Sequence, residues 1–293
     1  MTAPQHGEPA ILFVCLDFTT PGIAFGAGYH LGVGYLRAYL EGVGVATDQL
    51  IDAAPVSLAA LARKIVERNV GIIGFTCYDP TYYLIRELSA AIKLLAPDRT
   101  IVVGGPSATF SDELILSDAP AVDFCIRGEG EEAAEQLISA VNSGQDISDV
   151  SGLSYRHGGE IVRNVENVPR SSRKDEELDS LPSPYLTGMI PPSEGWHIGV
   201  VSSRGCRYRC TFCNFASMTH HTVRLHSPER LVAELSLINH HTAKSAQSLS
   251  ILGEPYSEVP LHIFDDNFTH FTAEVGPLKA TFQPAEVRAG VSE

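Results

Sequence analysis

The chain has 293 residues, of which 44% are hydrophobic, and its 35 acidic and 21 basic side chains give a formal charge of −14. This length can bury one large or two medium cores, and the negative charge argues against sequence-independent nucleic-acid binding, which needs a basic surface. We expect neither a signal peptide nor a membrane span, since no run approaches the roughly 18 apolar residues required. Six cysteines, three of them closely spaced, fit a reducing compartment, so we predict a cytoplasmic protein with no nucleic-acid or membrane partner.

The first half of the chain alternates short apolar runs with amphipathic segments. Strands are predicted over 10–16, 45–51, 71–76, 100–104 and 122–126, and helices over 30–42, 58–67, 80–95 and 130–142. The first run is apolar throughout, as in a strand buried on both faces. Strands that alternate with helices of this length predict right-handed crossovers and a parallel sheet. The predicted fold class is therefore α/β, with a doubly wound, five-stranded, Rossmann-like domain over 8–145.

Four loops follow the carboxyl ends of these strands, where such sheets bind their ligands. The loops are 17–29, 76–79, 104–109 and 128–131. Their paired glycines allow a close backbone approach to a bulky ligand, and two of the loops offer hydroxyls. The candidate ligand-binding residues are Thr76, Cys77, Tyr78, Gly104, Gly105, Ser107, Thr109, Gly128, Glu129 and Gly130. Taken alone, glycines at these positions are more often ordinary strand-to-helix turns.

A connecting region is predicted over 146–195. It begins with a hairpin over 152–164 that turns at Gly158-Gly159, and continues as a linker rich in charge, serine and proline. The second domain, 196–293, is expected to begin with a strand over 196–202.

Two further elements are predicted in the second domain. Ser227 and Pro228 have the N-cap and first-turn residue types of a helix. A second strand is expected over 261–264. Strand, loop, helix and strand together would form one βα unit of a barrel.

The loop after the first of these strands contains Cys206, Cys210 and Cys213 in the order Cys-x3-Cys-x2-Cys. Thiolates at this spacing can bind one [4Fe–4S] cluster from a single loop and leave the fourth iron open to a substrate or cofactor. One alternative is structural zinc, for which His220 and His221 are the nearest further ligands. The other alternative is three incidental core cysteines.

This spacing, with Phe212 just before the third cysteine, resembles the radical S-adenosylmethionine (SAM) superfamily. Together with the glycine turns at 104–109 and 128–131, the chain resembles the B12-dependent, cobalamin-binding members. The resemblance implies a [4Fe–4S] cluster on the three cysteines and SAM chelated by the open iron. One electron would then release a 5′-deoxyadenosyl radical. It further implies SAM contacts from Phe212 and from Asp265-Asp266, at the end of the second strand.

The resemblance also implies cobalamin as a cofactor, bound by the glycine turns and by Thr76–Tyr78. An Asp-x-His-x-x-Gly motif is absent, and His30 lacks the flanking residues of one. We therefore expect base-off cobalamin without a histidine ligand, its lower face open or touched by a residue of 76–78.

The family resemblance implies an enzyme, in most members a methyltransferase, that acts on a small-molecule or natural-product substrate and uses a reductant such as flavodoxin or ferredoxin. Some relatives rearrange or cyclise their substrates instead. A second hypothesis is an inactive cobalamin and iron–sulfur binding protein. A third is a methylthiotransferase-like enzyme with an auxiliary cluster on Cys15, Cys77 and Cys125, although buried free cysteine is also common in cores.

The barrel of the family has six βα units, whereas only two strands fit before residue 293. Residues 273–293 show no alternation of strand and helix. The second domain is thus expected to be an incomplete radical SAM barrel. Either the chain is truncated, or a homodimer or partner chain completes the barrel and covers its open edges.

Overall fold

A computed structural model describes residues 10–16, 30–52, 57–166, 178–191, 198–206, 208, 210–214, 223–245, 250–251, 254–255, 261–263, 272–275 and 278–281. The chain divides into two compact units, residues 1–167 and 168–293, each of which is described by itself. Across the described residues, no helix combines the length and apolar character needed to cross a bilayer.

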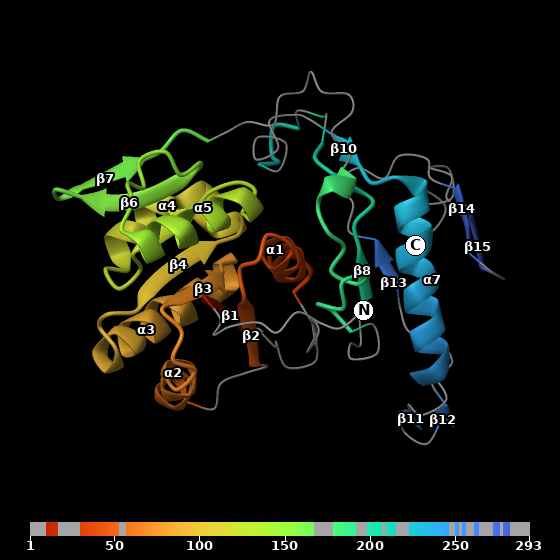
Figure 1. Ribbon diagram of the computed structural model, residues 1–293, viewed down its shortest axis with the longest axis horizontal. Coiled ribbons are helices and arrows are strands. Elements are labelled where there is room, and N and C mark those ends of the chain that lie inside the picture. The colour runs from red at the N-terminus through yellow and green to blue at the C-terminus, as the bar shows by residue number, and fades with distance from the viewer. Residues whose placement is uncertain are drawn as a thin grey trace. The chain divides into compact units, whose positions relative to one another are not determined.

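The first unit is built on one seven-stranded sheet with the order β2-β1-β3-β4-β5-β6-β7 (Figure 1). The strands are β1 (Ile11–Leu16), β2 (Thr47–Asp52), β3 (Ile72–Thr76), β4 (Thr100–Gly104), β5 (Phe124–Ile126), β6 (Leu153–His157) and β7 (Glu160–Arg163). The first five strands are mutually parallel, as predicted. Because β2 and β3 both pair with β1, the chain direction across the sheet reverses there, and β1 and β3 flank the switch point at which such folds bind ligands.

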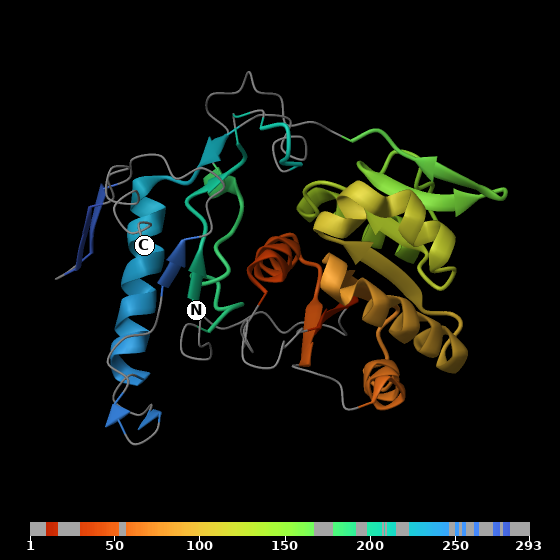
Figure 2. The same cartoon turned by 180° about the vertical axis from the view of Figure 1, so that it is seen from behind.

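Helices cover both faces of this sheet, which confirms the doubly wound fold (Figure 2). They are α1 (Leu31–Gly42), α2 (Leu58–Val66), α3 (Asp79–Leu95), α4 (Pro106–Asp118) and α5 (Glu131–Ser143). One core joins α2, α3 and α4 to the sheet, and the other joins α1 and α5 to its opposite face. Strand β1 serves both cores, because Leu12 and Val14 face the first and Ile11 and Phe13 the second. This explains its uninterrupted apolar sequence.

Helix α4 was not predicted. It follows Gly105, has Pro106 at its first position and is kinked at Ser111, whose φ is −136° and ψ 27°. The kink divides its buried positions between two short segments, so no single apolar stripe runs along the sequence. A periodicity search cannot find a helix built in this way.

The hairpin predicted at 152–164 exists, but it belongs to the sheet and not to a connecting region. Strand β6 pairs antiparallel with β5, with Phe124 opposite Tyr155 and Ile126 opposite Leu153, and β7 pairs with β6. The predicted boundary at 145 therefore moves to 167, because β5 would otherwise be an uncovered edge strand only three residues long.

Part of the predicted linker likewise belongs to the second unit. Residues 178–191 contain a 3₁₀ turn, η1 (Leu178–Ser180), and bury Leu178, Tyr185 and Ile190. The Tyr185 hydroxyl donates to the carbonyl of Gly199, 2.6 Å away. This segment is therefore packed structure, although its prolines and serines resemble those of a flexible connection.

The remaining elements of the second unit are β8 (Ile198–Val200), β9 (Ser203–Arg204), β10 (Arg224–Leu225), α7 (Pro228–Ser245), β11 (Ser250–Ile251), β12 (Glu254–Pro255), β13 (Leu261–Ile263), β14 (Thr272–Val275) and β15 (Leu278–Thr281). Strands β8 and β13 precede and follow α7 along the chain and pair in parallel, as one βα unit requires. The Ser227 hydroxyl caps α7 by accepting from the backbone N–H of Arg230 at 3.2 Å. The antiparallel pair β14–β15 was not predicted.

Candidate cofactor site

The turns after β3 and β4 are hydrogen-bonded to each other at the carboxyl edge of the sheet. The N–H of Cys77 donates to the carbonyl of Gly104 at 2.8 Å, and the N–H of Ser107 donates to the carbonyl of Cys77 at 3.1 Å. Gly105 lies between these contacts with a φ of +92°. A Cβ at this position would come within 3.0 to 3.2 Å of the Thr76 hydroxyl and the Cys77 backbone, so the close approach of the two turns requires glycine here.

Thr109 connects the turn after β4 to the turn after β5. Its hydroxyl donates to the carbonyl of Gly105 at 3.0 Å and accepts from the N–H of Gly128 at 3.1 Å. Three strand ends, which are far apart in the sequence, therefore form one hydrogen-bonded edge. Glu129 at this edge is exposed. Gly130 precedes α5, and its carbonyl accepts from the N–H of Ala134 at 2.8 Å.

Two of the predicted ligand groups are used within the protein. The Ser107 hydroxyl, which the sequence suggested for a ligand, donates to Asp79 Oδ1 at 2.5 Å. Cys77 is fully buried, and burial raises the pKa of its thiol to about 11. Tyr78, by contrast, has 40% of its surface exposed. Asp79 was not among the predicted site residues, and its position at the first turn of α3 was the available signal.

The turn after β4 leaves room for a ligand beside its backbone. Among the residues that the structure describes, a Cβ on Gly104 would meet only the carbonyl oxygen of Ile126, at 4.0 Å. Tyr78 and the glycine backbone provide apolar and hydrogen-bonding surface. The charged side chains of the three turns are the exposed Asp79 and Glu129 and the buried Glu131. The predicted loop 17–29 lies outside the described residues.

The second candidate site is the cysteine loop. It follows β9 through Gly205, whose φ is +105°, and turns where the N–H of Cys213 donates to the carbonyl of Cys210 at 3.1 Å. Cys206 is half-buried, whereas Cys210 and Cys213 are exposed, and none of the three forms a disulfide bond. Three cysteines on one loop are the kind of donor set that an iron–sulfur cluster requires.

The structure does not bring these three thiols together into a metal site. Among the described residues, no three His, Cys, Asp or Glu side chains are close enough together to hold a metal ion. Phe212 extends outward, with 88% of its surface exposed. The predicted SAM contacts Asp265 and Asp266, and the possible zinc ligands His220 and His221, lie outside the described residues. The cluster and SAM assignments therefore stay predictions.

The base of the cysteine loop is tied to the 178–191 segment through Asp179. Its Oδ1 lies 2.9 Å from Nδ1 of His226 and accepts from the N–H of Ser227 at 3.0 Å. The N–H of His226 in turn donates to the carbonyl of Ser202 at 2.9 Å. Burial and the neighbouring Arg230 lower the pKa of His226 to about 4, so it is neutral near pH 7. This contact was not predicted, because the sequence placed Asp179 in a linker.

An auxiliary cluster on the remaining cysteines is not supported by their positions. Cys15, Cys77 and Cys125 are all fully buried. Cys15 belongs to the core beneath α1 and α5, while the other two belong to the core on the opposite face of the sheet. Burial raises the pKa of the Cys125 thiol to about 12. Three thiols divided between two faces cannot converge on one metal cluster, and the structure uses them as core residues.

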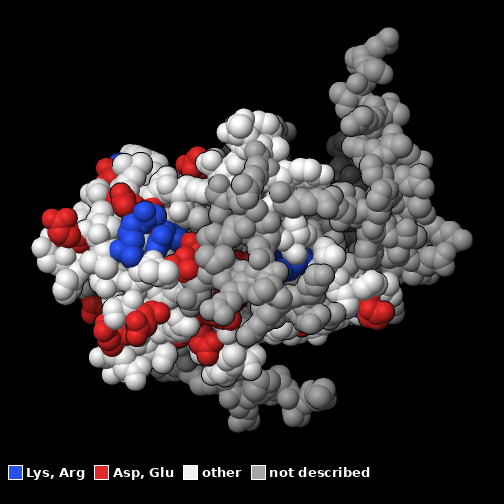
Figure 3. Space-filling view, turned by 90° about the horizontal axis from the view of Figure 1, so that it is seen from above, with Lys and Arg blue, Asp and Glu red and all other residues white. Residues whose placement is uncertain are grey.

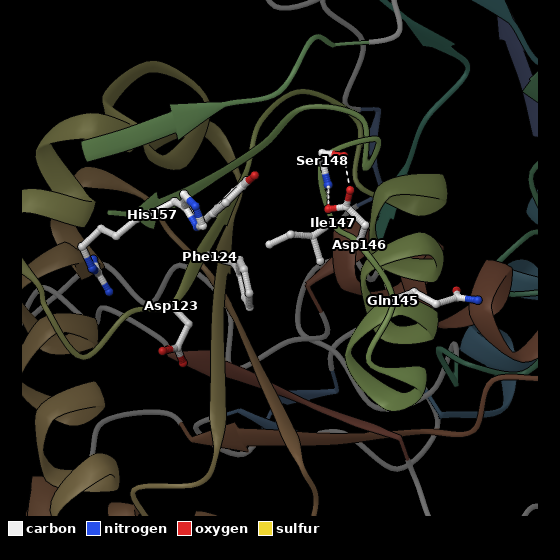
Figure 4. A pocket seen from close by; sticks show the side chains of 9 residues that line it. Asp123, Phe124, Gln145, Asp146, Ile147, Ser148 and His157 are labelled. Atoms are coloured by element: carbon white, nitrogen blue, oxygen red, sulfur yellow. Dashed lines mark hydrogen bonds between the residues drawn. The ribbon is translucent and has the colours of Figure 1, made fainter. Parts of the chain in front are cut away.

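A pocket of about 640 Å³ lies at the opposite, amino-terminal end of β5 (Figure 4). Its walls come from the start of β5, the end of β6 and the loop after α5, and include Phe124, Tyr155, Arg156, His157, Asp146 and Ile147. The rings of Phe124 and Tyr155 are 6.3 Å apart. Because the glycine turns follow the other end of the strands, this pocket is separate from the candidate cofactor site.

On the face of the molecule seen in Figure 3, basic side chains of the described residues form a patch that acidic side chains border.

Comparisons with known proteins identify relatives of both halves. Residues 24–138 match the B12 binding domain family. The chain is 28% identical to an uncharacterized methyltransferase of Pyrococcus horikoshii, over 83% of this chain and 50% of that protein. It is 31% identical to the cobalamin-dependent radical SAM methyltransferase TokK of Streptomyces tokunonensis, over 72% of this chain and 32% of TokK.

The structure resembles that of OxsB, a cobalamin-dependent SAM radical enzyme solved with aqua-cobalamin and SAM bound. The TM-score is 0.67 at 20% identity, over 92% of this chain and 35% of OxsB. The fold is therefore of the predicted class, a doubly wound α/β domain followed by one parallel strand pair, and it resembles the fold of a cobalamin-dependent SAM radical enzyme. The chain spans half or less of the length of these three proteins.

Proposed function

We propose that this chain, whose residues 24–138 match the B12 binding domain and which is related to cobalamin-dependent radical SAM methyltransferases, binds cobalamin, a [4Fe–4S] cluster and SAM and takes part in methyl transfer to a small-molecule substrate. The observation that carries the proposal is the presence, in one chain, of a match to the B12 binding domain and a loop with three cysteines, none in a disulfide, at Cys-x3-Cys-x2-Cys spacing. Neither feature alone would separate this function from simple cobalamin storage or electron transfer.

Each part of the chain has a defined task in this proposal. The glycine turns at 104–105 and 128–130 would receive cobalamin, with Tyr78 the exposed residue of the 76–78 loop beside it. Cys77 would not act as a cobalt ligand, because its thiol is buried and its raised pKa keeps it protonated. Cys206, Cys210 and Cys213 would hold the cluster, with Phe212 beside the SAM site. When bound, the cluster supplies the electron that cleaves SAM and cobalamin carries the methyl group.

The substrate and partners are proposed from the same relatives. A small-molecule substrate is proposed because the related methyltransferases include the carbapenam methyltransferase of Streptantibioticus cattleyicolor, 30% identical over 58% of this chain. A reductant such as flavodoxin or ferredoxin would reduce the cluster. Only β8 and β13 form a parallel pair among the described strands of the second unit. We therefore also propose that further polypeptide, from a second copy or a partner chain, completes the barrel.

The proposal is tested by SAM cleavage. Protein reconstituted anaerobically with iron, sulfide and cobalamin is reduced and supplied with SAM, and 5′-deoxyadenosine is measured together with iron content. We expect about four iron atoms per chain and release of 5′-deoxyadenosine, both lost in Cys206→Ala. Cys125→Ala is the matched control, because it removes a buried core thiol and should retain iron and cleavage.

Two results would contradict the proposal. If both cofactors load and no SAM is cleaved, this polypeptide by itself is a binding protein and not an enzyme. If Cys206→Ala retains the full iron content, the cluster assignment is wrong.

A further inference from the structure

A buried carboxylate lies close to the candidate cobalamin turns without facing them. Asp112 is on α4, and only 3% of its side chain is exposed. Its Oδ2 accepts from the Ser154 hydroxyl at 2.5 Å and from Arg163 Nε at 2.8 Å, and lies 3.4 Å from Arg127 Nε. Its partners thus come from β6, from β7 and from the end of β5, so one side chain joins the hairpin to the edge of the parallel sheet.

Arg127 needs this carboxylate. Only 11% of its side chain is exposed, and burial together with nearby Arg163 lowers the pKa of its guanidinium. A charge in this environment is costly unless it is paired, and Asp112 and Glu166 are the acids whose charges oppose the shift. Arg127 Nη2 also donates to the carbonyl of Asn164 at 2.5 Å. The side chain of Arg127 is therefore fixed between α4 and the segment that follows β7.

Arg127 immediately precedes Gly128, the first glycine of the turn after β5. Thr109 and Asp112 lie three residues apart on α4, on either side of the kink at Ser111. The Thr109 hydroxyl accepts a hydrogen bond from the backbone N–H of Gly128, while the Asp112 carboxylate forms an ion pair with the side chain of Arg127. The N–H of Arg127 also donates to the carbonyl of Gly152 at 3.0 Å. Two consecutive residues of the turn are thus held from one helix, one by its backbone and one by its side chain.

We propose that Asp112 is a positioning residue for the cobalamin site, which fixes the turn at Arg127–Gly128 in the arrangement that receives the cofactor. The inference rests on the proposed function, because it assigns the turn to cobalamin. This inference extends the site to the β6–β7 hairpin, although none of the three strand-to-helix turns belongs to the hairpin. The hairpin therefore contributes to cofactor binding through Ser154 and Arg163, which hold Asp112 beside Arg127.

The test compares cobalamin affinity with the local exchange of the turn in the full chain. Asp112→Asn keeps the size of the side chain and removes its charge. We expect the Kd for hydroxocobalamin to rise about tenfold, as for the loss of one hydrogen bond to a charged group. We also expect faster hydrogen–deuterium exchange in the peptide 124–130, which contains the N–H of Gly128, while the exchange of β1 stays unchanged.

Arg156→Met is the matched control. Arg156 also joins the hairpin to α4 and to the segment before β5, by donating to the carbonyls of Leu116 and Val122, but at the opposite end of the strands. This variant should lower the melting temperature and leave the Kd for cobalamin within about twofold of the wild-type value. If the two variants weaken cobalamin binding in proportion to their loss of stability, Asp112 is structural only and the proposal is overturned.

A second variant keeps the test decisive if Asp112→Asn does not fold. Arg163→Met removes a partner whose side chain is 43% exposed, and we expect about a threefold rise in Kd and faster exchange at 124–130. An unchanged Kd and unchanged exchange in this variant would overturn the proposal. Failure of the wild-type chain to bind cobalamin would instead contradict the proposed function. The exchange of the turn would still report whether Asp112 positions it.

Discussion

The glycine turns of the first unit and the cysteine loop of the second are both candidate cofactor sites, but the protein builds them differently. At the glycine turns, hydrogen bonds of Cys77, Ser107 and Thr109 connect three strand ends. The buried Asp112, through its ion pairs with Arg127 and Arg163, supports the turn after β5. In the cysteine loop, Cys210 and Cys213 share one backbone hydrogen bond and their thiols are exposed.

The difference follows from the chemistry of the two proposed ligands. A corrin is bound by shape and by many weak contacts, which a preformed surface provides without an ordering cost. A cluster forms covalent bonds to its thiolates, and such bonds can order a loop when the metal binds. The first site is therefore expected to be present in the apoprotein, and the second to be completed by its cluster.

Thiol reactivity gives the largest expected contrast. In the apoprotein at pH 8, an alkylating reagent should modify Cys206, Cys210 and Cys213 at least about a thousandfold faster than Cys15, Cys77 and Cys125. The core thiols are fully buried, and the pKa values of two of them are raised to about 11 and 12, so they react only after local opening. Mass spectrometry of timed samples measures the two rates.

Cluster reconstitution sharpens this contrast. The three loop thiols should become protected once iron is bound, whereas the core thiols should be unaffected. Equal labelling of all six cysteines in the apoprotein would show that the first unit is not preformed.

Acid should destabilise the second unit through His226. The pKa of His226 is lowered from 6.5 to about 4 in the folded state. Between pH 6.5 and pH 4, this histidine is therefore protonated in the unfolded chain but neutral in the folded chain. Stability that is complete above pH 6.5 is therefore lost across this window, by up to about 3 kcal/mol. His226→Asn can still donate to Asp179 but cannot titrate, and should show a shallower dependence on pH.

Urea unfolding at several pH values measures this effect. The only tryptophan of the chain, Trp196, belongs to the second unit and provides its fluorescence signal. Identical pH dependence in the wild type and His226→Asn would show that other groups, such as Asp179, cause the acid sensitivity.

Two glycine substitutions separate backbone strain from close packing, with a smaller expected effect. Gly105 and Gly159 have φ values of +92° and +90°, but a Cβ meets the Thr76 hydroxyl and Cys77 only at Gly105. Gly159→Ala should cost about 1 kcal/mol from strain, and Gly105→Ala about 2 kcal/mol more. Urea unfolding measures the free-energy difference, and cobalamin titration should show weaker binding for Gly105→Ala alone. Equal losses in the two variants would mean that the turns are not tightly packed.

The strands and most helices of the first unit could be predicted because their burial patterns are local. The apolar run over 10–16 corresponds to β1 (Ile11–Leu16), and the predicted helix over 58–67 to α2 (Leu58–Val66). The position of the glycine turns at one edge of the sheet could be predicted because parallel strands place their carboxyl ends together. Their internal hydrogen bonds could not, since the use of Ser107 by Asp79 depends on the packing of two helices.

Three features could not be predicted from the sequence, for physical reasons. The kink at Ser111 removes the periodicity of α4. The pairing of β6 with β5 is a contact between segments that a whole helix separates. Asp112, Arg127 and Arg163 are charged residues, which a single sequence suggests are exposed, and only the fold shows that the first two are buried together.

The attachment of the hairpin to β5 has a practical consequence for isolating the cobalamin-binding part. A chain that ended at residue 145 would leave the short, apolar β5 without its antiparallel neighbour, and open strand edges recruit other molecules into aggregates. Such a fragment would also contain Arg127 and Asp112 without Arg163. A recombinant fragment that continues through Asn167 retains both the covered edge and the charge network, and is the form in which this part of the protein should stay monodisperse at the concentrations that crystallisation requires.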